Sequence, residues 1–252
     1  MSPTVALLVR RLHRLKREPF NVTFTLSQPL IWLLLYSNLM RKASFPGAEG
    51  IPYPTFVLPG VIAFTVFGNS LAGGIPVLFD KENGFLTRLL AAPIPRSAII
   101  LSQFAYVTLL TVAQVLLVAA LGVLLLGATF STGLPGLLAA LVVSALLGLG
   151  LTVISIALAF ALHGHGEFFA IIGFAGLPLL FLSSALVPLE TMPGWMRVAA
   201  WANPMTHATN AIRGLAVNGW NAGELALSVA VIVAFDAAFL SLGLRTLRRK
   251  LG

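Results

Sequence analysis

The sequence has 252 residues, of which 58% are hydrophobic and only 10% are charged, whereas soluble domains carry about 25% charged residues. With a mean hydropathy of +0.95, this composition excludes a water-soluble enzyme and is typical of a chain that crosses a membrane several times. The absence of cysteine excludes disulfides, thiolate catalysis and cysteine-ligated zinc. The net charge of +8 indicates basic segments beside a membrane rather than a nucleic-acid partner.

Residues 1–20 combine an apolar face with a basic one. Apolar side chains recur every three or four positions from Val5 to Leu15, which is helical spacing. The segment is predicted to form an amphipathic helix in the membrane interface, and the alternative is a solvated basic segment that only orients the first span. We do not expect a signal peptide, because no small-x-small cleavage site follows Met40. The basic side chains are Arg10, Arg11, Arg14, Lys16 and Arg17.

Six apolar stretches follow, and each is predicted to span the membrane. They cover residues 24–40, 56–76, 99–126, 134–162, 168–187 and 225–244. The first is short and contains Gln28 and Pro29, so it is expected to be tilted or distorted. In the fourth stretch a small residue at every fourth position predicts close helix packing. These small residues are Ala140, Ser144, Gly148 and Thr152.

Lysine and arginine are divided unequally between the two sides of the predicted bundle. The segment before the first span, the 77–98 segment and the tail after residue 244 hold twelve of them. The segments on the other side, 41–55, 127–133 and 188–224, hold four. Because basic residues accumulate in cytoplasmic loops, this division predicts that both termini are cytoplasmic, which requires an even number of spans.

A polar segment at residues 77–98 joins the second and third predicted spans. Its apolar positions are spaced as in a helix, and Pro93 is expected to end that helix. A short amphipathic helix at this place can dock in a groove of a soluble partner, whereas the alternative is a solvated connecting turn. The residues assigned to this contact are Glu82, Gly84, Leu86, Arg88, Leu89, Leu90 and Pro93.

A second segment, residues 188–224, is predicted to lie outside the membrane and to re-enter it. Its sequence favours two short helices, interrupted at Asn203-Pro204. Three tryptophans are typical of an aromatic belt, so the segment is expected to dip into the outer leaflet. A lid over the outer ends of the fifth and sixth spans remains an alternative. The residues singled out are Trp195, Asn203, Pro204 and Arg213.

Polar residues inside predicted spans are candidates for a transport pathway. Asp236 lies midway along the last span, where an ionised aspartate costs about 2.5–3.5 kcal/mol, so it should face protein or water. We favour a hydrogen bond to a neighbouring helix, through Ser241 or a polar group of the first spans, over a proton or cation site. Gln103 and Gln114 in the third span are the other pathway candidates.

The sequence offers little for catalysis or cofactor binding. No Gly-x-x-x-x-Gly-Lys-Ser/Thr motif occurs, so the chain is not expected to bind ATP or any other cofactor itself. His163, His165 and Glu167 lie close together, but on a glycine-rich turn they favour a contact with a partner protein over a metal site. No pair of His, Asp or Ser is arranged across facing spans, so no catalytic residues are assigned.

Two groups of residues together carry a resemblance to a known family. The first group is Glu82, Gly84, Arg88, Leu89, Leu90, Pro93 and Arg96, and the second is Pro193, Trp195, Asn203, Pro204 and Arg213. Their order resembles the permease subunits of type-two ATP-binding-cassette (ABC) exporters, over essentially the whole chain. Within that family the chain is most similar to the daunorubicin-resistance-like drug and lipid exporters, and the polysaccharide exporters are neighbours.

The resemblance implies an all-α membrane fold and a function in transport rather than catalysis. Residues 1–252 would form one permease domain of six transmembrane helices, with an amino-terminal interfacial helix, a coupling helix after the second span and a broken outer hairpin before the sixth. A separate cytoplasmic ATPase would bind ATP and magnesium, and a second permease subunit, expected to be identical, would complete the pathway in the plasma membrane.

The expected cargo is an amphipathic drug, a lipid or a lipid-linked molecule, moved outward. Two alternatives stay open. One is a polysaccharide-exporter permease of the same family, and the other is a stand-alone proton-coupled transporter that uses Asp236.

Overall fold

The computed structural model describes residues 2–17, 19–40, 50–162 and 164–251. Arg41, Lys42 and His163, which enter the charge count and the assessment of a metal site, lie outside these ranges. Within them the fold is entirely helical and contains no strand, which confirms the predicted all-α fold class. The elements are α1 (Pro3–Arg17), α2 (Pro19–Leu39), α3 (Tyr53–Ala72), α4 (Ile75–Glu82), α5 (Phe85–Ala91), α6 (Arg96–Leu126), α7 (Gly133–Ala161), α8 (His165–Phe181), η1 (Leu189–Thr191), α9 (Gly194–Trp201), α10 (Pro204–Arg213), η2 (Gly214–Asn218) and α11 (Ala222–Leu251).

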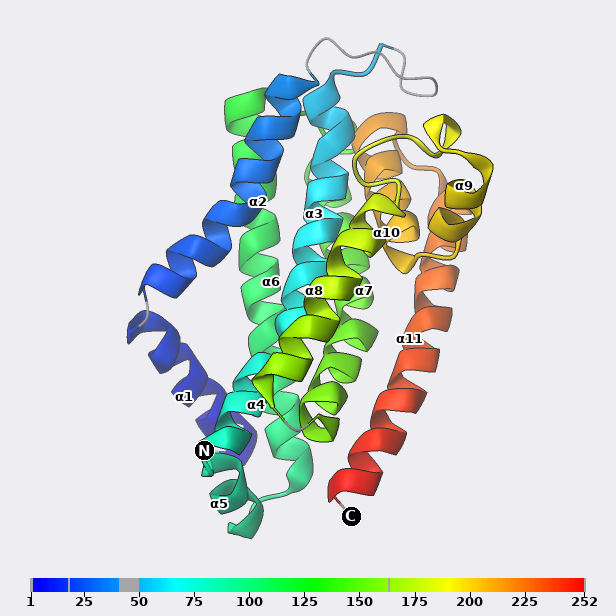
Figure 1. Cartoon of the computed structure of the whole chain (residues 1–252). Coiled ribbons are helices and arrows are strands. Elements are labelled where there is room, and N and C mark those ends of the chain that lie inside the picture. The colour runs from blue at the N-terminus through cyan, green and yellow to red at the C-terminus, as the bar shows by residue number, and fades with distance from the viewer. Residues whose placement is uncertain (1, 18, 41–49, 163, 252) are drawn as a thin grey trace.

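The long helices run side by side as a bundle, and both ends of the chain lie at the same end of it (Figure 1). We call this the terminal end, and it also holds α1, α4 and α5. The opposite end holds α9 and α10. A shared end for both termini agrees with an even number of crossings, while the side of the membrane on which it lies remains a prediction.

Four segments in the described part of the chain are long and apolar enough to cross a membrane: Tyr53–Glu82, Arg96–Leu126, Gly133–Ala161 and Ala222–Leu247. The apolar helix α8 has 17 residues, and α2 has 21 residues with Pro29 inside it. The chain is therefore a multi-pass membrane protein, and the count of six spans stays a prediction.

Three predicted boundaries are wrong. The second span does not end at residue 76, because the helical path continues through α4 to Glu82. The fifth does not reach residue 187, because α8 ends at Phe181 and residues 182–187 form turns. The last does not end at residue 244, because α11 continues through the basic tail to Leu251. In the first and last cases the helix continues through polar residues beyond its apolar stretch. Hydropathy alone detects the end of the apolar stretch but not the end of the helix.

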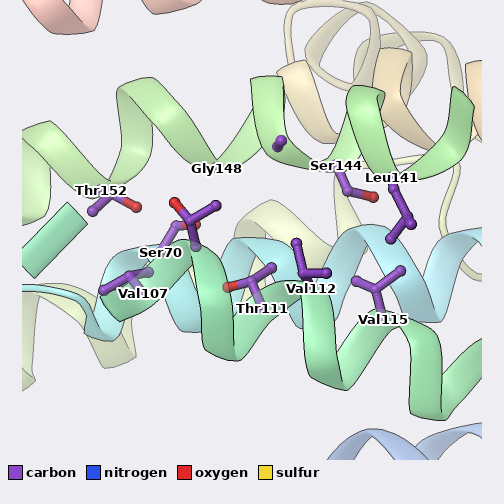
Figure 2. A pocket seen from close by; sticks show the side chains of 11 residues that line it. Ser70, Val107, Thr111, Val112, Val115, Leu141, Ser144, Gly148 and Thr152 are labelled. Atoms are coloured by element: carbon purple, nitrogen blue, oxygen red, sulfur yellow. The ribbon is translucent and has the colours of Figure 1, made fainter. Parts of the chain in front are cut away.

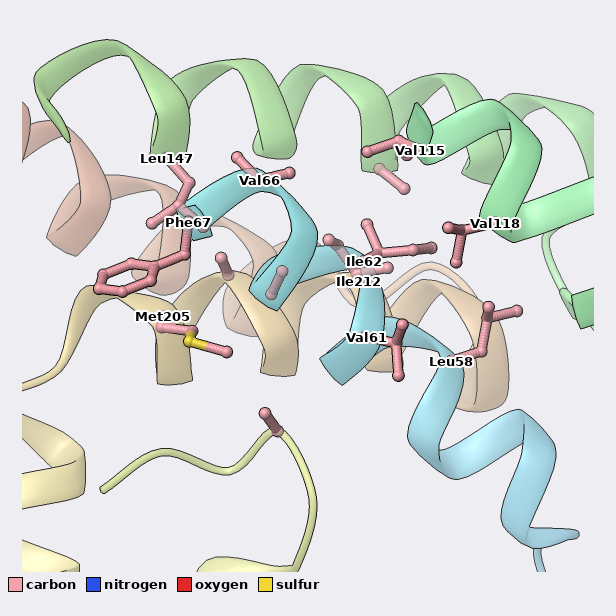
Figure 3. Close-up of a cluster of buried hydrophobic side chains, with 14 of the residues drawn as sticks. Leu58, Val61, Ile62, Val66, Phe67, Val115, Val118, Leu147, Met205 and Ile212 are labelled. Carbon is pink, nitrogen blue, oxygen red and sulfur yellow. The ribbon is translucent and has the colours of Figure 1, made fainter. Parts of the chain in front are cut away.

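The centre of the bundle is α3, whose side chains are buried along most of its length. Its neighbours are α2, α6, α7 and α10, and α7 in turn lies along α11. Figure 3 shows the apolar side chains that fill the space between α3, α6, α7 and α10. They include Leu58, Val61, Ile62, Val66, Phe67, Val115, Val118, Leu147, Met205 and Ile212.

The small residues of the fourth predicted span lie at helix contacts, as their spacing predicts. A Cβ atom added to Gly148 would lie 3.0 Å from the Ser70 hydroxyl of α3. Ala140, Ser144 and Thr152 are all buried on α7. Because short side chains let helix backbones approach, this stripe allows α7 to pack closely against α3 and α6.

Candidate functional site

The segment predicted to dock a partner forms a bend between two short helices at the terminal end. The last residue of α4 is Glu82, and α5 begins at Phe85. Gly84 joins them with φ of +68°, a left-handed conformation that glycine adopts without strain. The second helix ends at Ala91, just before Pro93, as predicted. Residues 77–82, the first part of the predicted polar segment, belong to α4, however. The bend that leaves this helix therefore begins after Glu82, later than predicted.

The three leucines of this segment do not form one outward apolar face, which corrects the sequence interpretation. Leu86 is only 5% exposed and packs inward against Val77 and Ile99. Leu89 is half-buried against the same cluster, whereas Leu90 is 40% exposed. The outward face of α5 is therefore formed by Thr87 and Ala91, with Arg88 at one edge and Leu90 at the other, all of them exposed. The periodicity identified the apolar stripe of the helix but not whether this stripe faces the protein interior or the outside.

Ion pairs fasten α4 to the amino-terminal helix. The buried Asp80 carboxylate lies 3.1 Å from the guanidinium of Arg10 and 3.3 Å from that of Arg11. Arg10 also stacks over the Phe85 ring, 3.6 Å from its centroid. Burial lowers the pKa of Arg11, and the facing Asp80 carboxylate opposes this shift. Arg10 and Arg11, on the basic face of the predicted interfacial helix, therefore contact protein.

A further contact joins the end of α4 to the start of α8. The Glu82 carboxylate accepts a hydrogen bond from the backbone N–H of His165 at 3.0 Å, and it lies 2.9 Å from Nδ1 of the same residue. Lys81 donates to the carbonyls of Phe160 and Leu162 at the end of α7. The predicted docking segment and the turn around His165 are thus neighbours. Among the described residues no group of three metal-ligating side chains occurs.

Two of the three pathway candidates lie inside the bundle, on the face of α6 that meets α3. Gln103 is completely buried and donates from Nε2 to the carbonyl of Gly73 at 2.6 Å. Gln114 accepts a hydrogen bond from the side chain of Asn69, which also lies 3.5 Å from the Thr111 hydroxyl. Both glutamines therefore join α6 to α3 within one chain.

A small cavity of about 10 Å³ lies between α3, α6 and α7 (Figure 2). The hydroxyls of Ser70 and Ser144 lie at its wall, and neither has a hydrogen-bond partner in the described part of the chain. Such a volume holds about one water molecule, whereas sites for drug-sized ligands measure about 300–1,000 Å³. This cavity is therefore too small for cargo.

The third pathway candidate, Asp236, joins α11 to α7. Its Oδ1 accepts a hydrogen bond from the backbone N–H of Gly150 at 3.0 Å. A Cβ atom at Gly150 would lie 2.5 Å from that oxygen, so the approach requires glycine. The predicted hydrogen bond to a neighbouring helix is present, but Ser241 is not the partner, because its hydroxyl bonds to the carbonyl of Ala238.

The side chain of Asn203 joins the end of α8 to the start of α10 at the opposite end. Its Oδ1 accepts from the N–H of Met205 at the start of α10, and its Nδ2 donates to the carbonyls of Leu179 and Leu182 at the end of α8, both at 2.7 Å. Pro204 follows as the first residue of α10, where its missing N–H costs nothing. The predicted interruption therefore serves as a cap for two helices at once.

Arg213 fixes the far end of α10. It donates to the carbonyls of Phe56 at 3.1 Å and of Ser184 at 2.7 Å, and its guanidinium stacks on the Phe56 ring. Helix α10 is buried among α3, α7 and α11 rather than laid over them as a lid. Trp195 is 69% exposed on α9, in agreement with an aromatic residue at a membrane interface.

Two residues that the sequence interpretation missed have structural roles. Asp80 lies two positions before Glu82 and was not assigned, although an acidic residue near a helix with five basic residues is a signal for pairing. Ser155 bonds to the junction between α3 and α4, and its sequence context gives no signal, because serine is common in membrane helices.

The chain matches the family described as ABC-2 type transporter over residues 3–217. It is 39% identical over 216 residues to a transport permease named ycf38 of Cyanophora paradoxa, covering 83% of this chain and 72% of the relative. It is 29% identical over 250 residues to the daunorubicin resistance ABC transporter permease protein DrrB1 of Streptomyces coeruleorubidus, covering 99% and 87%.

A third relative is the doxorubicin resistance ABC transporter permease protein DrrC of Mycobacterium tuberculosis, with 24% identity over 221 residues that cover 87% of this chain and 78% of the relative. These relatives point to a transporter rather than an enzyme, and the family implies an ABC ATPase as partner. The chain belongs to the ABC-2 type transporter family, as a membrane-spanning transport permease.

Proposed function

We propose that this chain is the membrane subunit of an ATP-driven exporter and that α4 and α5 transmit the motion of a separate ATPase. The observation that carries the proposal is the bend at Gly84, which presents Arg88 and Leu90 outward at the terminal end. Its base is fastened to three other elements, because Asp80 pairs with α1, Lys81 donates to the end of α7 and Glu82 contacts the start of α8. A force applied to α5 would therefore reach several helices together.

The ATPase would dock against the outward face of α5 and would bind ATP and magnesium itself. An exposed face with a cation at one edge, a leucine at the other and small side chains between them suits a shallow groove with an acidic rim on one side. In this proposal the terminal end, with both termini, lies on the cytoplasmic side of the plasma membrane. The charge count from the sequence supports the same orientation.

A second copy of the chain would cover the exposed face of α8. The side chains on this face include Phe169, Phe174, Leu177 and Phe181, which are 44%, 83%, 56% and 52% exposed. The cavity inside the bundle is too small for cargo. A pathway between two copies therefore explains how a single tightly packed bundle serves transport.

The cargo would be an amphipathic drug, a lipid or a lipid-linked molecule. Two relatives carry daunorubicin or doxorubicin resistance in their names, which supports daunorubicin as the first probe. Asp236 does not favour a stand-alone proton-coupled transporter, because its carboxylate is engaged with Gly150 on the next helix.

The test of this function is Glu82→Ala in the full complex purified with its ATPase. We expect the ATPase to remain bound, since Glu82 lies outside the outward face of α5. The rate of daunorubicin transport into inverted vesicles should fall several-fold, because α4 loses its contact with the start of α8. Glu224→Ala is the matched control, because Glu224 is exposed at the opposite end. Full transport by Glu82→Ala, or the absence of any ABC ATPase in the purified complex, would refute the proposal.

A further inference from the structure

The helical path between α3 and α4 is interrupted at Gly73 and Gly74. Pro76 explains the interruption, because it has no N–H for the carbonyl of Ala72 and its ring would collide with that carbonyl in a continuous helix. The N–H of Gly73 bonds instead to the carbonyl of Ser70, three residues back. In a membrane helix each backbone group released in this way needs another partner.

Two side chains from neighbouring helices bond to backbone groups on either side of the interruption. The Ser155 hydroxyl of α7 accepts from the N–H of Gly74 at 2.8 Å and donates to the carbonyl of Leu71, so one group serves both sides of the interruption. Gln103 of α6 donates to the carbonyl of Gly73 at 2.6 Å. Ser155 and Gln103 are each completely buried, so water does not compete for these bonds.

The backbones meet closely at this point. A Cβ atom added to Gly74 would lie 2.3 Å from the carbonyl oxygen of Ser155 and 2.9 Å from the Phe168 ring. The junction is therefore held against α7 by contact as well as by hydrogen bonds. A change in the angle between α3 and α4 that carries Gly73 and Gly74 away from α6 and α7 would break the bonds from Ser155 and Gln103.

We propose that Ser155 and Gln103 are positioning residues that lock the junction between α3 and α4, so that α4 and α5 change their angle to α3 only when these hydrogen bonds open. This proposal rests on the proposed function for its link to the ATPase, because α5 is the assigned contact. It assigns Gln103 a role in transmitting motion instead of lining a pathway for cargo.

The first experiment measures amide hydrogen exchange in the full chain, reconstituted in lipid nanodiscs. Ser155→Ala is expected to speed exchange in peptides covering residues 71–78 about tenfold, equivalent to about 1.4 kcal/mol, with unchanged exchange in α11. Gln103→Met keeps the length of the side chain but removes its donor, and it is expected to act on the same peptides. Unchanged exchange at 71–78 in both variants overturns the proposal.

Ser144→Ala is the matched control. Ser144 lies on the same helix and is also buried, but its hydroxyl has no hydrogen-bond partner among the described residues. Its removal should leave exchange at residues 71–78 unchanged. Equal acceleration by Ser144→Ala and Ser155→Ala would show that any lost hydroxyl on α7 loosens the bundle, which also overturns the proposal.

The second experiment separates positioning from simple stabilisation, using the ATPase that co-purifies with the tagged chain. Ser155→Ala should keep ATP hydrolysis within about twofold and lower the daunorubicin transported per ATP several-fold. A normal transport ratio, despite faster exchange, would show that Ser155 only seals the junction and would contradict its positioning role. If no ATPase co-purifies with the unmodified chain, the proposed function fails. The exchange experiment still tests whether Ser155 and Gln103 lock the junction between α3 and α4.

Discussion

Ion pairs between helices, together with the bonds from Lys81 to the end of α7, hold the terminal end of the bundle, whereas bonds to backbone carbonyls hold the opposite end. At the terminal end, charged side chains on separate helices pair with one another, as Asp80 does with Arg10 and Arg11. At the opposite end, Asn203 and Arg213 bond to backbone carbonyls of α8, of α3 and of the turns after α8. An exposed contact between two side chains, such as that of Glu82 with His165, can separate and form again, whereas bonds to backbone carbonyls satisfy the ends of helices.

This difference indicates which end can move during transport. Backbone carbonyls at a buried helix end have no alternative partner, so the opposite end should act as a fixed frame. Exposed groups such as Glu82 and His165 can exchange their contact for water or for a partner protein at little cost. We therefore expect the terminal end to rearrange during transport and the opposite end to stay rigid.

The largest effect is expected at the buried ion pair, where Asp80→Ala leaves the Arg11 guanidinium without its carboxylate. Loss of one partner of a buried pair costs about 3 kcal/mol, and α1 should detach from α4. The free energy of unfolding in an SDS titration measures this cost. Glu224→Ala, which removes an exposed carboxylate at the opposite end, should change it by less than about 0.5 kcal/mol. Equal values for the two variants would show that the terminal end is not held by this pair.

A somewhat smaller loss, about 2 kcal/mol, is expected for Arg213→Ala, because the carbonyls of Phe56 and Ser184 lose a charged donor. Arg197 offers a matched comparison, since it also donates to backbone carbonyls but is exposed. The same unfolding measurement should give a smaller change for Arg197→Ala. If Arg213→Ala instead leaves the free energy of unfolding unchanged and lowers only the rate of transport, the opposite end is not a fixed frame.

Between the two ends, Gly150→Ala is expected to cost about 1–2 kcal/mol, because its Cβ would collide with Asp236 and force α7 from α11. Gly176→Ala on α8 meets nothing within 4 Å and should be neutral or stabilising. Unfolding titrations of the two alanine variants, read against the unmodified chain, distinguish collision from a general effect of glycine replacement. A neutral Gly150→Ala would contradict the close contact.

The smallest effect is expected for Asp236→Asn, because the amide oxygen can still accept from the N–H of Gly150. Stability should change by less than about 0.5 kcal/mol. Daunorubicin transport should stay within twofold of the unmodified chain at every pH tested. A correctly assembled variant without transport would revive the proton-coupled alternative.

The sequence predicted those features that local chemistry determines. Asn203 followed by Pro204 marks a helix start by capping and by the missing N–H, and Pro93 marks a helix end, so both were predictable. The inward turn of Leu86 was not predictable, because periodicity defines a stripe but not the helix against which it packs. The partner of Asp236 was also not predictable, since it is a backbone N–H 86 residues away.

We propose that the outward face of α5 contacts the ATPase, and photo-crosslinking in intact cells detects such a contact. A photoreactive amino acid would replace Arg88 on α5 in one variant and Trp195 on α9, at the opposite end, in another. The account predicts a crosslinked product between Arg88 and an ABC ATPase, identified by mass spectrometry, and no such product from Trp195. An ATPase crosslinked at Trp195, or none at Arg88, would contradict the assignment of the coupling helix and of the cytoplasmic side.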